Sequence, residues 1–151
     1  MAKPNILIIM GSSSDMPKLE PAKQILQEFG IGFKVVVASA HRNPKKVMAV
    51  VKSADKNCDL IIAAAGMAAH LPGVVASHTT LPVIGVPIMS KSLSGFDALY
   101  SIVQMPSGIP VACVAIDGAK NAAILAAEIL SLKYTALKTK LKTFRTKLAK
   151  R

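Results

Sequence analysis

The sequence predicts an α/β fold with a mostly parallel sheet, on three observations. Five short apolar runs are spaced along the chain, and helical patterns separate them. Loops of polar or small residues follow the first three runs. At 151 residues the chain is long enough for one domain with a sizeable core. We expect three layers, αβα, with five strands in the doubly wound order 2-1-3-4-5.

The first half of the chain supplies three strands and three helices. Strands are expected over residues 6–10, 33–38 and 60–64, where continuous apolar runs are typical of strands covered on both faces. Helical patterns follow over residues 16–29, 44–51 and 71–77. Gly30 can end the first helix, which Ser14 or Asp15 can cap. Asn43 can cap the second, with Pro44 in its first turn.

The second half continues the alternation. Strands are expected over residues 81–86 and 111–116, with helices over 96–104 and 122–132. The tail, residues 133–151, carries eight Lys or Arg and no acid, and so accounts for most of the net charge of +11. Its apolar residues are spaced 3, 4, 3, 4 along an amphipathic helix: Tyr134, Leu137, Leu141, Phe144 and Leu148.

The basic tail has two interpretations. It can pack its apolar seam on its own or a neighbouring subunit and leave a solvated basic face, or it can bind nucleic acid. We favour packing, because two Tyr, four Phe and no Trp in the whole chain make a poor surface for stacking bases. We therefore expect residues 1–132 to form one domain and the tail helix, residues 133–151, to belong to the same domain or to a subunit interface.

Membrane and disulfide-rich classes are disfavoured. The longest small or apolar run, Leu60 to Ala69, falls well short of the roughly 20 residues that span a bilayer. Cys58 and Cys113 stand alone, with no metal-ligand spacing, and are expected to be reduced thiols. We expect a soluble cytoplasmic protein with no membrane contact.

Three loops should meet at one pocket, because the first three strands are neighbours in the predicted sheet and ligands bind at the carboxyl ends of such strands. They are residues 11–15, 39–44 and 63–73. The first combines backbone amides at a helix start with three serines, which suits an anion. It lacks the second glycine and the Lys of common nucleotide motifs, so plain helix capping remains an alternative, as does flavin phosphate binding in a flavodoxin-like domain.

Two histidines stand out in these loops. His41 precedes Arg42, so a residue able to carry a proton near neutral pH adjoins one able to grip phosphate with two hydrogen bonds. The alternative is a surface Arg beside a capping His. His70 lies among alanines, where it can equally be a core histidine bonded to a carbonyl.

Four segments carry a resemblance to a known family. They are Gly11-Ser12-x-Ser14-Asp15, Ser39-Ala40-His41-Arg42-x-Pro44, Ala65-Gly66-x-Ala68-Ala69-His70-Leu71-Pro72-Gly73, and the stretch from Ser101 through Met105-Pro106-x-Gly108 to Val111. In order and spacing they resemble the N5-carboxyaminoimidazole ribonucleotide mutase family, the PurE proteins of purine biosynthesis. The resemblance covers about residues 5 to 132 and continues in Gly118-Ala119-Lys120-Asn121.

The resemblance implies a flavodoxin-like fold and a carboxylate transfer, from the exocyclic nitrogen of an aminoimidazole ribonucleotide to C4, without metal or organic cofactor. It implies that Ser12, Ser14, Ser39 and Arg42 bind the phosphate and Asp15 the ribose. His41 matches the general acid/base and His70 a second active-site histidine. Ala65, Gly66 and Ala68 would leave room for the imidazole and carbon dioxide, and Leu71 joins the substrate-binding residues.

The resemblance also implies a closed homo-octamer with active sites shared between subunits. Separately, we expect residues 91–95 to form a loop that covers the pocket. Asn43, Met67 and Asp117 depart from the usual Thr, Gly and Gly. A related branch carboxylates aminoimidazole ribonucleotide directly with carbon dioxide. The Ala68-Ala69-His70-Leu71-Pro72 segment favours the mutase over that branch, and a flavin-binding or nonenzymatic module is a third hypothesis.

Overall fold

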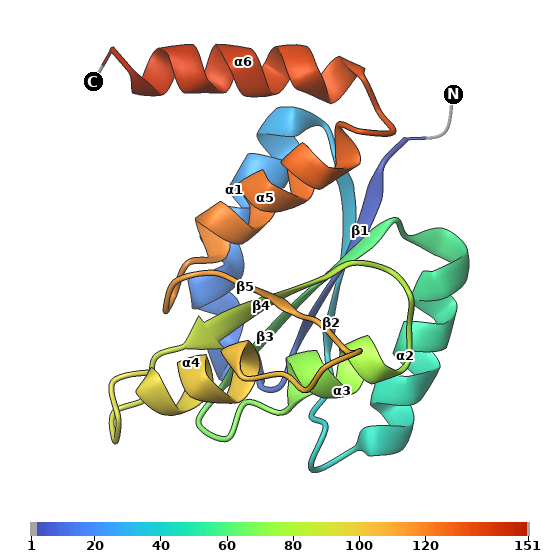
Figure 1. The fold of residues 1–151 in the computed structure, drawn as a ribbon, viewed down its shortest axis with the longest axis vertical. Helices are drawn as coiled ribbons and strands as arrows, with labels where there is room; N and C mark the ends of the chain where they lie inside the picture. Colours follow the sequence, from blue (N-terminus) through green and yellow to red (C-terminus); the bar gives the residue numbers. More distant parts are fainter. Residues whose placement is uncertain (1–2, 151) are drawn as a thin grey trace.

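The protein is a three-layer α/β structure in a computed structural model that describes residues 3–150 (Figure 1). Its strands are β1 (Asn5–Met10), β2 (Gly32–Val37), β3 (Leu60–Gly66), β4 (Val83–Ile88) and β5 (Ala112–Cys113). They form one parallel sheet in the order β2-β1-β3-β4-β5. The predicted doubly wound, flavodoxin-like arrangement is therefore confirmed.

Helices cover both faces of this sheet. In chain order they are the 3-10 turn η1 (Ser13–Asp15), then α1 (Met16–Phe29), α2 (Pro44–Asn57), α3 (Leu71–Ser77), α4 (Phe96–Val103), α5 (Ala119–Leu130) and α6 (Ala136–Leu148). Helices α1 and α5 pack side by side on one face, and α6 lies across their ends (Figure 1). Helices α2, α3 and α4 lie on the other face.

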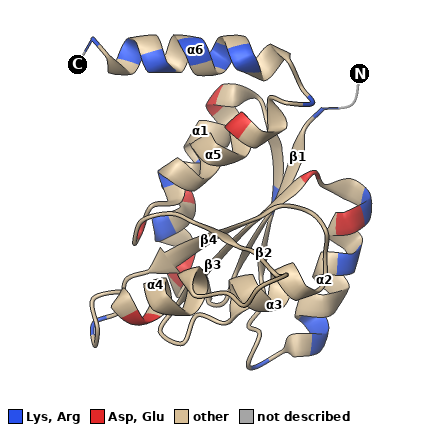
Figure 2. Cartoon of the chain, in the orientation of Figure 1, with Lys and Arg blue, Asp and Glu red and all other residues tan. Residues whose placement is uncertain are grey.

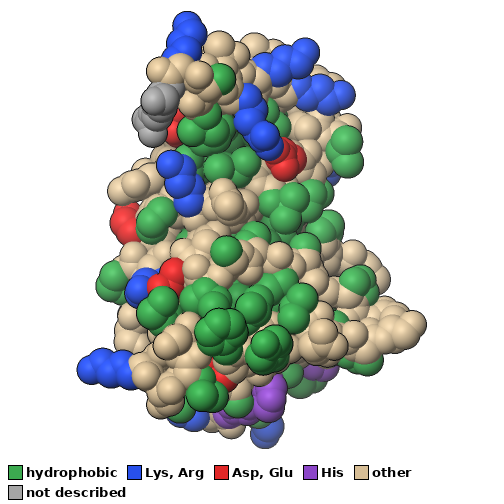
Figure 3. Space-filling view, turned by 60° about the vertical axis from the view of Figure 1, so that its left-hand side comes forward, with side chains coloured by type: hydrophobic (Ala, Val, Ile, Leu, Met, Phe, Trp, Pro, Cys, Tyr) green, Lys and Arg blue, Asp and Glu red, His purple; other side chains and the backbone are tan. Residues whose placement is uncertain are grey.

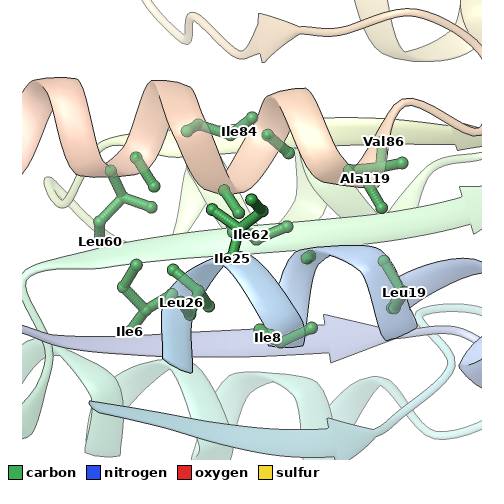
Figure 4. Packing of buried hydrophobic residues seen from close by; sticks show 14 of the residues in the cluster. Ile6, Ile8, Leu19, Ile25, Leu26, Leu60, Ile62, Ile84, Val86 and Ala119 are labelled. Carbon is green, nitrogen blue, oxygen red and sulfur yellow. The ribbon is translucent and has the colours of Figure 1, made fainter. Parts of the chain in front are cut away.

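Strand β1 shows why a continuous apolar run is needed at the centre of the sheet. Ile6 and Ile8 point toward α1, where they meet Leu26 and its neighbours (Figure 4). Leu7 and Ile9 belong to the core on the opposite face. Each of these side chains is at most 2% exposed, and burying one contributes about 1.5–3 kcal/mol to folding. If polar and apolar residues alternated along β1, the helices on one face of the sheet would have no apolar side chains of β1 to pack against.

Several details differ from the sequence prediction. Helix α2 continues to Asn57 rather than ending near Val51, and β4 covers Val83–Ile88 rather than residues 81–86. Strand β5 has two residues rather than six, although the amides of Val114 and Asp117 still donate to Gly85 and Pro87 of β4. Helix α5 begins at Ala119, three residues early. Asp15 stands at the N-cap of α1 as predicted, but its side chain makes no capping hydrogen bond; the Oγ of Ser12 accepts from the amide of Ser14 and caps the short η1 turn.

The tail helix packs on its own chain. Leu137 is buried, and the Phe144 ring meets Phe29 edge to face at 5.6 Å. The Nζ of Lys140 donates to the carbonyl oxygen of Phe29 at 2.7 Å. This carbonyl lies at the C-terminus of α1, where it has no hydrogen-bond donor within the helix. Leu148, the last residue of the seam, stays 43% exposed. From these contacts we infer that α6 belongs to the same folded unit as residues 3–132. Its Lys and Arg positions are marked in blue in Figure 2, and their side chains are exposed.

No helix within residues 3–150 is both long enough and apolar enough to cross a membrane.

Candidate active site

A pocket of about 670 Å³ opens at the carboxyl ends of β1, β2 and β3. The strand order brings the loops that follow these strands together, as predicted. Every residue predicted for the site lines this one pocket: Ser12, Ser14, Asp15, Ser39, His41, Arg42, Ala65, Gly66, Ala68, His70 and Leu71. The roles assigned to them by resemblance remain predictions.

The loop after β1 presents a chain of hydroxyl groups at a helix start. The Oγ atoms of Ser12 and Ser14 lie 2.8 Å apart, and the Ser14 hydroxyl is 3.5 Å from Oδ1 of Asp15. The short turn η1 and then α1 begin here, so backbone amides also point toward the loop. Hydroxyl and amide donors at a helix N-terminus form a favourable place for a phosphate.

Asp15 is the carboxylate of this loop. The pKa of Asp15 lies above its ordinary value, mainly because burial disfavours the charged form. Hydrogen bonds from the Ser14 side chain and the Ser12 backbone lower the pKa, and the negative charge of Asp117 raises it. The hydrogen bonds that the folded protein supplies to this carboxylate therefore do not compensate for the burial of its charge. A ligand that donates hydroxyl hydrogen bonds, such as a ribose, would supply the missing partners.

Arg42 connects the loops after β1 and β2. Asn43 caps α2 by accepting from the amide of Lys46 at 3.1 Å, which places Arg42 just before the helix. The Oγ of Ser39 accepts from the Arg42 amide at 3.2 Å, and the Arg42 guanidinium donates to the carbonyl oxygen of Gly11, also at 3.2 Å. That is the guanidinium's one hydrogen bond within residues 3–150, so most of its five donors are available to an anion.

The two histidines meet at the pocket. Nε2 of His41 lies 2.7 Å from Nδ1 of His70, and the rings are nearly perpendicular, at 85°. Two ring nitrogens at this distance must share one proton, because two N–H groups or two lone pairs facing each other would repel. Both side chains are exposed, so His70 is not the carbonyl-bonded core histidine that its alanine neighbours allowed. The pair can hold and pass a proton beside a bound ligand.

The end of β3 is built from small residues that allow close approach. Ala65 and Gly66 lie opposite Pro87 and Ile88 of β4. A Cβ on Gly66 would come within 3.3 Å of the Ile88 carbonyl oxygen, so a side chain there would crowd the sheet. Met67 follows with a φ of +57°, a left-handed conformation that glycine adopts more easily than methionine.

Sequence reasoning missed part of the pocket wall. Six residues beyond the named site residues line it: Gly11, Ala40 and Met67, which lie in the three predicted loops, and Ile88, Met89 and Ser90, which do not. The last three lie at the end of β4 and just after it, and β4 neighbours β3 in the predicted order, so their position could have been expected from topology. The expected covering loop, residues 91–95, does not line the pocket, although it begins directly after Ser90.

Other reactive groups lie elsewhere. Burial raises the pKa of both cysteine thiols, at Cys58 and Cys113, and neither lines this pocket. Within residues 3–150, no three His, Cys, Asp or Glu side chains gather as metal ligands.

Comparison with known proteins places this geometry in a family. The AIR carboxylase family model matches residues 5–151. An N5-carboxyaminoimidazole ribonucleotide mutase of Pyrococcus horikoshii is 57% identical over 143 residues, which is 94% of this chain and 81% of that protein. One of Methanocaldococcus jannaschii is 58% identical over 146 residues, 97% of this chain and 91% of that protein.

A solved structure is similar over nearly the whole chain. The crystal structure of Treponema denticola PurE has a TM-score of 0.90 and 35% sequence identity, and the match covers 98% of this chain and 93% of that one. The fold, the converging loops and the sequence matches agree, and the chain belongs to the AIR carboxylase family.

Proposed function

We propose that this protein is a mutase of purine biosynthesis that converts N5-carboxyaminoimidazole ribonucleotide to 4-carboxy-5-aminoimidazole ribonucleotide. The observation that carries the proposal is the His41–His70 pair, 2.7 Å apart, in the same pocket as the serine loop and Arg42. One side of the pocket thus suits proton transfer and the other a phosphate. Relatives more than 50% identical bear the name of this mutase, which supports the same assignment here.

Substrate binding follows from the donors around the pocket. The phosphate would accept hydrogen bonds from Ser12, Ser14, Ser39 and Arg42, close to the helix start. The ribose hydroxyls would donate to Asp15, whose carboxylate lacks strong partners in the free protein. The imidazole would then lie over Ala65, Gly66 and Ala68, where small side chains leave space, with the histidines at its edge.

The reaction needs only one proton and no redox step. The carbamate N–C bond breaks, the exocyclic nitrogen takes up a proton, and carbon dioxide is released inside the pocket. The electron-rich C4 then forms a bond to that carbon dioxide and loses its own proton. His41 can give the first proton and take back the second, with His70 as its hydrogen-bond partner, so the enzyme ends as it began.

Carbon dioxide must not escape between the two steps. Ala65 is 7% exposed and Leu71 3%, so apolar groups form part of the floor and would keep water from the intermediate. The pocket of this single chain is open at its rim, where His41, Arg42 and Met67 are exposed. Closure would come from the loop after β4, from a second subunit, or from both.

We also propose that the protein is a homo-oligomer, with the octamer as its expected form. Hydrophobic side chains gather on the face that carries α4, and a histidine lies near the edge of this area (Figure 3). The exposed residues include Leu93, Phe96, Tyr100 and Val103, three of them more than half exposed. Such an area on a chain of this size is typical of a protein interface. Light scattering should give a mass near eight times 15.9 kDa, whereas a stable monomer would contradict this proposal.

The decisive test of function is a pair of rate measurements by ultraviolet absorbance. The protein is given N5-carboxyaminoimidazole ribonucleotide in one assay and aminoimidazole ribonucleotide with bicarbonate in the other. We expect rapid product formation from the first substrate alone. Efficient use of the second at modest bicarbonate would make the protein a direct carboxylase, and inactivity with both, together with flavin absorbance in the purified sample, would favour a flavin-binding module.

A further inference from the structure

Asp117 lies outside the pocket but bonds to Met89 of its wall and to Lys18 of α1. It is the last residue before the turn into α5, and it does not line the pocket itself. Its Oδ1 accepts from the backbone amide of Met89 at 3.0 Å. Its Oδ2 accepts from Nζ of Lys18, in the first turn of α1, at 2.6 Å. One carboxylate therefore links the segment after β4 to the helix that starts at the serine loop.

The backbone holds Asp117 firmly in this place. Its amide donates to the carbonyl oxygen of Pro87 at 2.8 Å, and its φ is +55°. The amide of Gly118 then donates to Ala115, and a Cβ on Gly118 would come within 2.6 Å of the same carbonyl oxygen. The turn is thus too tight for other residues at position 118. Both oxygens of Asp117 are aimed by a turn that has little freedom to move.

The segment that Asp117 holds forms one wall of the pocket. Ile88, Met89 and Ser90 line it, opposite the loops after β1 and β2. Asp97 holds the same segment from its other side by accepting from the Ser90 hydroxyl at 3.2 Å. The Met89 side chain is 52% exposed and so contributes little packing of its own. Ile88 is buried in the core and paired in the sheet, so hydrogen bonds fix mainly the positions of Met89 and Ser90.

We propose that Asp117 is a positioning residue that holds the Ile88–Ser90 wall at a fixed distance from the Ser12–Asp15 loop, and so sets the width of the substrate pocket. We call the two side-chain contacts of Asp117, to the Met89 amide and to Lys18, the clamp. The effect on catalysis rests on the function proposed above, whereas the clamp itself does not. Asp117 touches neither the histidines nor the proposed phosphate donors, so its loss should leave the chemical step largely intact. A displaced wall should instead weaken substrate binding.

Three substitutions separate the parts of this clamp. Asp117→Gly removes both side-chain contacts and keeps a residue that adopts positive φ without cost. Asp117→Asn keeps the oxygen that accepts from Met89 and loses the charge that pairs with Lys18. Lys18→Met removes only the ion pair, whose partners are 47% and 22% exposed and which is therefore expected to contribute little.

Amide hydrogen exchange tests the clamp without any substrate. We expect exchange at the Met89 amide to rise about tenfold in Asp117→Gly, the scale of losing a hydrogen bond to a charged acceptor. It should stay within about twofold of the wild type in Asp117→Asn and in Lys18→Met, which keep that acceptor. Unchanged exchange in Asp117→Gly would overturn the proposal whatever the enzyme acts on.

Steady-state kinetics then test the effect on the pocket. For Asp117→Gly we expect KM for the carboxylated ribonucleotide to rise about tenfold while kcat changes by less than about threefold, with Asp117→Asn close to the wild type. A fall in kcat alone, or an unchanged KM despite faster exchange, would overturn the positioning role. An inactive wild-type protein would instead refute the proposed function and leave the exchange result to decide on the clamp.

Discussion

Two aspartates at opposite ends of the sheet show how differently the same side chain is used. Asp59 lies at the amino end, just before β3, and accepts hydrogen bonds from the amide of Asn5 at 3.1 Å, from Lys133 at 2.8 Å and from the Tyr134 hydroxyl at 3.0 Å. Asp15 lies at the carboxyl end, where its hydrogen bond from the Ser14 hydroxyl is long, at 3.5 Å, and no charged donor pairs with it among the described residues. The first carboxylate has its partners inside the protein, and the second lacks them.

The pKa shifts of these two carboxyls have opposite signs. Burial alone would raise the pKa of Asp59, but the bonds from Lys133, the Asn5 amide and Tyr134 outweigh it, and the net pKa is lowered. Burial raises the pKa of Asp15, and its weaker bonds do not reverse the effect. The amino end therefore uses its charge to stabilise the fold. The carboxyl end keeps a charge that costs stability and can serve a ligand.

The largest expected effect is at the carboxyl end, in His41→Asn. Turnover should fall at least about a thousandfold, because the proposed general acid/base is lost, while the melting temperature stays close to that of the wild type. Steady-state kinetics and thermal unfolding on the same sample check both halves. Near-normal turnover would mean that His70 or another group carries the proton.

Arg42→Ala should have the next largest effect, and it should act on binding. The guanidinium is exposed and holds only the Gly11 carbonyl in the described part of the chain, so stability should barely change. Affinity for the phosphorylated ligand, measured by calorimetry, should fall about 10- to 100-fold, as expected for loss of a charged bidentate donor. Lys45→Ala is the matched control, since it removes a neighbouring charge that does not line the pocket; equal losses would point to general charge attraction.

Asp59→Asn should affect stability and leave activity alone. We expect a loss of about 2 kcal/mol in the free energy of unfolding at pH 7, since three donors lose a charged acceptor. The folded pKa is lowered, so this contribution is present above the unfolded pKa of about 3.9 and is lost as the pH falls through the folded pKa. The difference between variant and wild type in urea unfolding should therefore shrink at pH 3.

Tyr134→Phe is a smaller change at the same place, because it removes one of the three donors and keeps the ring. It should cost about 1 kcal/mol in the free energy of unfolding at pH 7, measured in the same urea series. A pH-independent loss in Asp59→Asn, or a marked fall in its kcat, would contradict the division between the two ends.

Among the substitutions expected to change stability, Asp15→Asn should have the smallest effect. It is also the sharpest comparison, because the same Asp-to-Asn change should have the opposite sign from Asp59→Asn. A carboxyl with a raised pKa destabilises the fold at pH values above that pKa and ceases to do so as the pH falls below the unfolded value. In urea unfolding at pH 7 the variant should gain a few tenths of a kcal/mol, as suits a partly exposed group, and it should bind the ribonucleotide more weakly. A clear loss of stability would show that Asp15 serves the fold.

The sequence predicted most of the site because the site follows from topology. Continuous apolar runs indicated covered parallel strands, and that arrangement places the loops after β1, β2 and β3 together. The contact between His41 and His70 joins residues 29 positions apart, and no local pattern contains it. It follows only once the strand order is known.

What the sequence did not predict depends on contacts without a local signal. The wall formed by Ile88, Met89 and Ser90 carries no motif, and Asp117, which bonds to Met89, follows β5, the neighbouring strand at the edge of the sheet. The apolar run over residues 111–116 did not indicate that β5 has only two residues. Met67 and Asp117 appeared in the sequence only as departures from the family pattern. The structure places both in left-handed conformations that glycine would adopt more easily.

The central claim is that the carboxyl-end pocket moves a carboxylate within one bound molecule. The most direct test is to supply N5-carboxyaminoimidazole ribonucleotide labelled with ¹³C in its carboxylate, in a buffer with unlabelled bicarbonate, and to follow the label by NMR through a single turnover. We predict that the product keeps the label at its C4 carboxylate. A product whose carboxylate has equilibrated with the unlabelled pool would contradict the account, because the carbon dioxide would then have left the pocket.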